Sequence, residues 1–319
     1  MCLRVLQLSC LLALFQCCFL NGFSQNVLSP YPIDACTTYT FRSQTGDAAY
    51  DNHINDMYGN STGNSFQVGY TTINGNQDGL LQQLDINGKV VWSKTFGNSS
   101  LNERIQSIGK LPDGTLVMTG TIENTNGTNQ HPFVAAADMA GTFLWIKSIQ
   151  TATDYRGAYV LATKTGTIGV VAEDDSTMLY ARFNTSGNIA WLKKVQALPK
   201  SKTVGMVEDV RWFIGYTGEE GGRKIGGIIV IDSLTGNIVR TKQFGGGATN
   251  SDFIFHSLQL INIRPRITGI YSENNQPYKL FRMSSSQAND FQTVGFFETF
   301  NTPTINFDAT AFSTQSTWS

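Results

Sequence analysis

Polar and ionisable residues stand just ahead of several hydrophobic runs, and they are the residues of this chain best suited to chemistry. They occur in the segments YDNHI (50–54), NERI (102–105), TDYRG (153–157) and NSDF (250–253). Histidine, tyrosine, arginine and carboxylates serve acid–base catalysis and hydrogen-bonded recognition. The candidate ligand-binding residues are Asp51, His53, Glu103, Arg104, Asp154, Tyr155, Arg156 and Asp252. The alternative role for Asp and Asn at such loop-to-strand junctions is to cap backbone N–H groups.

Other reactive residue types do not form a recognisable constellation. His53, His131 and His256 are far apart in sequence and lack metal-ligand spacing. The segment 74–79, NGNQDG, resembles a calcium loop but lacks its first carboxylate, so we expect a hairpin turn. We interpret the acidic run 173–175, EDD, as a solvated loop. No serine-hydrolase or phosphate-binding glycine motif is present, and we expect neither a metal nor a cofactor, and no catalytic residue.

The composition favours a β-protein with many turns. Charged residues are 15% of the 319 residues, and 31 are glycine. The formal net charge is -1, and the one small basic cluster, between Lys193 and Lys202, is too slight for nucleic-acid affinity. We therefore expect no nucleic-acid partner.

The N-terminus resembles a secretory signal peptide. Arg4 precedes an apolar run that reaches about Leu20, and small residues follow at Gly22 and Ser24. Residues 1–24 are predicted to be removed, which leaves a secreted chain without membrane insertion. Four of the five cysteines lie in this segment, so only Cys36 remains and no internal disulfide is expected. Four sequons are candidate N-glycosylation sites, at Asn60, Asn98, Asn126 and Asn184.

A repeated motif indicates how the candidate residues are positioned. The segments LDINGKVVW, ADMAGTFLW, FNTSGNIAW and IDSLTGNIVR begin at residues 84, 137, 183 and 231. Their tryptophans, and the arginine that replaces the last one, lie 53, 46 and 49 residues apart. Periods of about 50 residues are typical of propellers and solenoids. The motif residues are Asp85, Gly88, Trp92, Asp138, Gly141, Trp145, Asn184, Gly187, Trp191, Asp232 and Gly236.

Each repeat contains four short runs rich in β-formers, separated by Asp-Gly, Asn-Gly or Thr-Gly turns. A four-stranded sheet that is repeated radially is a β-propeller. The motif glycine makes a turn that needs positive φ, and the tryptophan of the next strand is expected to pack against the neighbouring blade. The sequence therefore predicts an all-β fold, a propeller of four-stranded antiparallel blades.

The fourth copy, with Asp232, Thr235 and Gly236, resembles the quinoprotein-like propeller repeat A-x-D-x-x-T-G-x-x-x-W. The repeat region is also similar to secreted, often bacterial, propeller repeat proteins of mostly unknown activity. The other three copies have a turn that is one residue shorter. The resemblance implies one propeller domain over 25–319, with blades near 50–96, 101–149, 155–195, 203–244 and 253–300. A partial sixth blade, an irregular closure from 38–43 and 304–312, or a truncated chain remain open.

In this strand order the candidate residues gather at one mouth of the central channel, where propellers bind ligands. The leading hypothesis is a secreted, non-enzymatic binding scaffold for a carbohydrate or protein. The alternative is a propeller enzyme, either a quinoprotein-like oxidoreductase or a polysaccharide lyase or hydrolase. For the latter, His53 would have to meet Tyr155 and Arg156 at the mouth. The sequence sets neither the ligand nor the oligomeric state.

Overall fold

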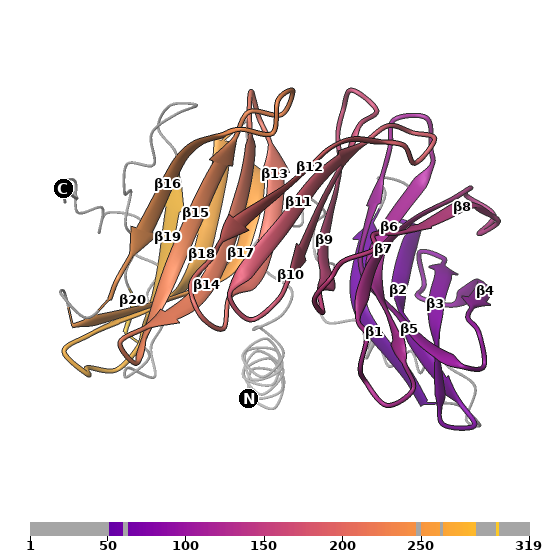
Figure 1. Cartoon of the computed structure of the whole chain (residues 1–319), viewed down its shortest axis with the longest axis horizontal. Coiled ribbons are helices and arrows are strands. Elements are labelled where there is room, and N and C mark those ends of the chain that lie inside the picture. Colours follow the sequence, from indigo (N-terminus) through magenta and orange to yellow (C-terminus); the bar gives the residue numbers. More distant parts are fainter. Residues whose placement is uncertain (1–50, 60–62, 247–249, 262–263, 285–297, 300–319) are drawn as a thin grey trace, which may run out of the picture. The chain divides into compact units, whose positions relative to one another are not determined.

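The fold is described from a computed structural model, which covers residues 51–59, 63–246, 250–261, 264–284 and 298–299. These residues form five four-stranded antiparallel sheets, each built from strands that are consecutive in sequence (Figure 1). All of them belong to one structural unit, 45–319. The prediction of an all-β fold with four-stranded units is confirmed.

The five sheets are named A to E in chain order. Sheet A contains β1 (Asp51–Gly59), β2 (Ser65–Ile73), β3 (Asn76–Leu84) and β4 (Val90–Phe96). Sheet B contains β5 (Leu101–Lys110), β6 (Leu116–Asn124), β7 (His131–Ala137) and β8 (Phe143–Ser148). Sheet C contains β9 (Arg156–Ala162), β10 (Ile168–Glu173), β11 (Thr177–Phe183) and β12 (Ile189–Gln196).

Sheet D contains β13 (Lys202–Glu208), β14 (Trp212–Glu220), β15 (Arg223–Ile231) and β16 (Ile238–Phe244). Sheet E contains β17 (Ser251–Ile261), β18 (Arg264–Glu273), β19 (Lys279–Ser284) and the short β20 (Glu298–Thr299). Each sheet contacts the next one along the chain, and the first strands β1, β5, β9, β13 and β17 contact one another in succession. Each first strand therefore lies beside the first strand of the next sheet.

Turn chemistry explains the hairpins. Asn74 and Gly75 both have positive φ, 53° and 83°, as a two-residue type I′ turn between β2 and β3 requires. This is the hairpin turn that the sequence favours over a calcium loop. The motif turn is different, since Asp85 Oδ1 accepts the backbone N–H groups of Asn87 and Lys89. Asp138 and Asn184 do the same in their copies, whereas Asp232 Oδ1 accepts from Leu234 N and Thr235 N in the longer turn.

The hydrophobic core is divided among the junctions between neighbouring sheets. Phe66 and Leu81 of sheet A pack with Ile105 and Phe133 of sheet B, and all four side chains are fully buried. Corresponding clusters join sheets B and C, C and D, and D and E. The fourth strands β4, β8 and β12 contain only exposed and half-buried residues, which suits outer strands.

Three motif tryptophans join neighbouring sheets in the same way. A Cβ atom at Gly141 would lie 2.6 Å from Trp92, one at Gly187 2.9 Å from Trp145, and one at Gly236 2.8 Å from Trp191. The indole of each motif therefore covers the turn glycine of the next motif. Trp145 Nε1 also donates to Thr185 O at 2.9 Å, and Trp191 Nε1 to Ser233 O at 3.3 Å.

The junction between sheets D and E lacks the motif tryptophan. Arg240 occupies the motif position on β16 and is exposed. Phe244, Phe253, Phe255 and Phe281 instead form an aromatic cluster, with ring centroids 5.4 to 6.2 Å apart. Edge-to-face and tilted rings at these distances contribute beyond their area burial. Phenylalanine rings therefore pack this junction without a motif indole.

Several predicted features lie outside the described residues. They are the signal peptide 1–24, Cys36, the two closing segments 38–43 and 304–312, and the sequon asparagine Asn60.

Candidate functional site

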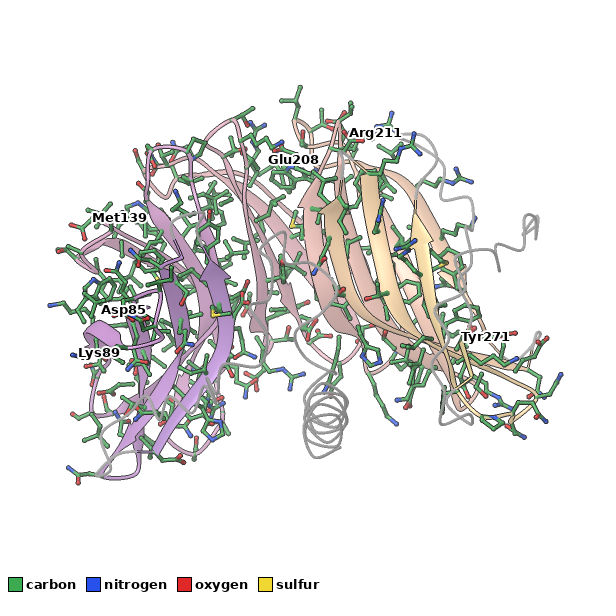
Figure 2. All side chains as sticks on the ribbon, turned by 180° about the vertical axis from the view of Figure 1, so that it is seen from behind. Asp85, Lys89, Met139, Glu208, Arg211 and Tyr271 are labelled. Atoms are coloured by element: carbon green, nitrogen blue, oxygen red, sulfur yellow. The ribbon has the colours of Figure 1, made fainter. Side chains whose placement is uncertain are left out.

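The candidate residues lie at one end of the sheets, called here the mouth rim. Antiparallel pairing places the start of each first strand beside the end of the second and the start of the third, as in Asp51 opposite Thr72. The mouth rim therefore contains the loops before β5, β9 and β17 and the turns between second and third strands. The opposite rim contains the motif turns. In Figure 2, Tyr271 on β18 lies near the mouth rim, whereas Glu208 and Arg211 lie at the opposite rim.

Three of the junction residues cap backbone N–H groups of the preceding sheet. Asn102 Oδ1 accepts from Gln77 N at 3.1 Å, and Asp154 Oδ1 accepts from Gln130 N at 2.9 Å. Asp252 Oδ1 accepts from Lys224 N at 2.8 Å, and its Oδ2 lies 3.3 Å from Arg223. Each bond satisfies one N–H group at or just before the start of a third strand. This is the capping role weighed in the sequence analysis for Asp154 and Asp252.

A polar cluster crosses the junction of sheets A and B at the mouth rim. The His53 ring stacks on Tyr70 with centroids 4.8 Å apart and an interplanar angle of 11°. The Arg104 guanidinium lies 5.7 Å from the Tyr70 centroid. Arg104 also pairs with Glu123 at 2.6 Å and donates to Gln77. We call His53, Tyr70, Gln77, Arg104, Glu123 and Gln130 the rim cluster.

The rim cluster has a buried foundation and an exposed top. The Glu123 side chain is 2% exposed, while Arg104 is 34% and His53 55% exposed. Gln130 Nε2 donates to Glu123 Oε2 at 2.8 Å, so each carboxylate oxygen has a partner. Because a buried, fully bonded carboxylate holds the guanidinium, Arg104 is fixed in position before any ligand arrives.

Glu103 lies next to this cluster and has an unusual pKa. Its residue is buried, and burial raises the pKa of its carboxyl to about 7. The N–H of Asn98, 3.4 Å from Oε2, lowers that pKa, and the nearby charge of Asp78 raises it further. Glu103 and Asp78 are therefore two carboxyl groups that interact electrostatically at the junction of sheets A and B.

The other candidates make their contacts on sheet C. Tyr155 is buried, its hydroxyl contacts Thr177, and it does not stack with His53. Arg156 is exposed and pairs with Asp175 at 3.3 Å. The expected group of His53, Tyr155 and Arg156 is thus divided between sheets A and C, and Asp51 is the charged neighbour of His53, at 3.9 Å.

Sequence reasoning missed Tyr70, Gln77, Glu123 and Gln130. They do not stand ahead of a first strand but at the end of a second strand or near the start of a third. The signal was the antiparallel register itself, which sets Glu123 opposite Asn102 and Tyr70 opposite His53.

The other acidic and histidine residues considered for catalysis or metal binding have structural contacts or lie apart from one another. Glu173 Oε2 accepts from the N and Oγ1 of Thr203, at 2.6 and 2.7 Å, and burial raises its pKa. The described residues contain no group of three or more His, Cys, Asp or Glu side chains placed to hold a metal. His131 contacts Thr151, and His256 is exposed on β17. Among the same residues there is no helix of the length and apolarity needed to cross a membrane.

Comparison with known proteins supports the propeller fold. The chain is similar to hydrazine synthase from Kuenenia stuttgartiensis, with 9% identity, a TM-score of 0.52 and coverage of 76% of this chain and 66% of that one. The NanB sialidase K499G mutant from Streptococcus pneumoniae is 10% identical, with a TM-score of 0.53 and coverage of 79% of this chain and 62% of that one. The periplasmic gluconolactonase PpgL from Pseudomonas aeruginosa is 11% identical, with a TM-score of 0.52 and coverage of 77% of this chain and 72% of that one.

These likenesses define the class and leave the activity unresolved. The chain spans less than two thirds of the hydrazine synthase and sialidase chains. No family model and no curated protein matches the chain. Five four-stranded sheets joined in succession, together with these neighbours, make this chain a β-propeller protein, as the sequence predicted. At such identities the similarity extends to the fold alone.

Proposed function

We propose that this propeller binds a carbohydrate at the rim cluster. Sugars present many hydroxyl groups, which are met by fixed bidentate donors and acceptors, and apolar ring faces, which pack on aromatic rings. The rim cluster offers a guanidinium, carboxamides and a stacked His–Tyr pair within one junction. A ligand that spans sheets A and B would contact all of them.

The observation that carries the proposal is the anchoring of Arg104. Its guanidinium is held by Glu123 and Gln77 yet is 34% exposed. The buried carboxylate holds one side of the guanidinium, and the exposed part stays open to a hydroxyl group from the solvent side. An exposed donor in a fixed orientation is what ligand recognition requires.

The test is a glycan array on the purified protein, followed by calorimetry with each oligosaccharide that binds. We expect His53→Ala to weaken binding about tenfold, because the variant loses the stacking face. His256→Ala is the matched control, since His256 is also exposed but lies on β17 of sheet E. Equal loss in both variants, or no binding to any glycan, would reject the proposal.

A second candidate function, hydrolysis of the bound glycan, is favoured by Glu103. A carboxyl with a pKa of about 7 is partly protonated at neutral pH and can act as a general acid, while Asp78 supplies a second carboxylate. The expected result is that Glu103→Gln retains glycan binding but loses product formation, measured by chromatography of the oligosaccharides. Unchanged turnover in Glu103→Gln would exclude this role.

We also propose that the protein is secreted, with residues 1–24 as a signal peptide. The apolar run and the small residues near the cleavage position support this proposal. N-terminal sequencing of the protein from culture medium tests it, with Gln25 as the expected first residue. Retention in the cell with Met1 intact would contradict it.

A further inference from the structure

The opposite rim contains a cavity that the rim cluster does not explain. Its volume is about 530 Å³, within the range of small-molecule sites. It lies where the β9–β10, β13–β14 and β15–β16 turns converge, with Leu260 of β17 also on its wall. Glu208, labelled in Figure 2, belongs to this cavity and lies far from Tyr271 at the mouth rim.

The charges around the cavity are divided by sheet. Lys164 and Arg182 come from sheet C, whereas Glu208 and Asp209 come from the β13–β14 hairpin of sheet D. A cationic side therefore faces an anionic side across the junction.

These opposite charges do not pair with each other. Among the described residues, no ion pair joins Lys164 or Arg182 to Glu208 or Asp209. Arg182 donates through Nη1 to Ser233 O at 3.1 Å, which fixes its orientation and leaves other N–H groups of the fork available. Glu208 is held through Oε1 by Trp212 Nε1 at 3.2 Å. The space between the two sides is left open.

The rest of the wall is apolar and accessible. Val210 is 74% and Leu234 72% exposed, and the half-buried Leu260 completes this part of the wall. Exposed aliphatic side chains beside a cavity favour a ligand that carries an apolar group.

We propose that this cavity binds a short zwitterionic peptide with an apolar side chain. Its carboxylate would contact Lys164 and Arg182, and its ammonium group would contact Asp209 and Glu208. The apolar side chain would pack on Val210, Leu234 and Leu260. Because a peptide carries both charges a few bonds apart, it matches the separated cationic and anionic sides better than a simple anion or cation does.

Calorimetry with the dipeptide Leu-Leu on the full chain tests the proposal. We expect saturable binding, weakened about tenfold in each of two blocked peptides, N-acetyl-Leu-Leu and Leu-Leu amide, because each lacks one charge. Equal affinity for the free and blocked peptides would overturn the charge argument. No binding of Leu-Leu to folded protein would overturn the proposal altogether.

Two charge-neutralising variants locate the site. Asp209→Asn and Lys164→Gln should each weaken Leu-Leu binding about tenfold. Glu220→Gln and Lys147→Gln are matched controls, since both residues are exposed and neither lines the cavity. Binding that is unchanged in Asp209→Asn and Lys164→Gln would place the peptide elsewhere. Binding of Leu-Leu that survives His53→Ala separates this site from the rim cluster.

Discussion

Replacing Gly187 with alanine tests the contact that joins neighbouring sheets. Gly187 has a φ of 76°, and a Cβ there would lie 2.9 Å from Cδ2 and Cε3 of Trp145. Trp145 cannot move away freely, because its Nε1 is bonded to Thr185 O. The substitution therefore combines an unfavourable backbone conformation with a steric clash.

The size of the effect follows from these two terms. A left-handed conformation costs an L-residue about 1 to 2 kcal/mol. Overpacking a core contact costs about 1 to 3 kcal/mol more. We expect Gly187→Ala to lower the free energy of unfolding by roughly 2 to 5 kcal/mol, measured by urea denaturation followed through tryptophan fluorescence.

A second glycine separates the two terms. Gly127 has nearly the same φ, 78°, but an added Cβ there would meet no atom within 4 Å. Gly127→Ala should therefore cost only the backbone term, about 1 to 2 kcal/mol. Combining Gly187→Ala with Trp145→Ala should remove the clash, so the two losses should not add. Equal losses at Gly187 and Gly127, or additive losses in the double variant, would refute the role of the indole.

Three further predictions concern the charged groups. Glu123→Gln breaks the buried pair with Arg104 and should lower stability by roughly 3 kcal/mol, whereas the exposed control Glu220→Gln should leave it unchanged in the same denaturation assay. Because the pKa of Glu103 is raised, the folded state binds the carboxyl proton more tightly than the unfolded state does, and the stability from this group should be lost as the pH rises from 4.5 through about 7. Glu103→Gln should flatten this part of the plot of unfolding free energy against pH. An unchanged slope would contradict the raised pKa. Lys200 and Lys224 lower the pKa of Glu219 to about 2, so the stability from that carboxylate should be lost as the pH falls from 4.5 through about 2. Glu219→Gln should make the plot of unfolding free energy against pH less steep on its acid side. A steeper plot would count against the pairing of Glu219 with the two lysines.

The sequence alone determined the architecture of this protein. The recurring Asp, Gly and Trp residues, such as Asp138, Gly141 and Trp145, are local signals, because the turn needs positive φ within a few residues of the strand. Since the same motif returned about every 50 residues, it also predicted radial repetition. The candidate residues at the starts of first strands were found for the same reason, as they stand at fixed positions in the repeat.

Only the tertiary structure decided what those residues contact. Tyr155 and Arg104 lie one and two residues after the capping residues Asp154 and Asn102, yet the first is buried against Thr177 and the second is held at the surface by Glu123. Their partners come from second and third strands, more than 15 residues away in sequence, and depend on side-chain packing across a junction. The cavity at the opposite rim likewise depends on turns from different sheets. Spacing along a chain fixes turns and strand order, but the meeting of side chains from separate sheets is fixed by the packing of those sheets.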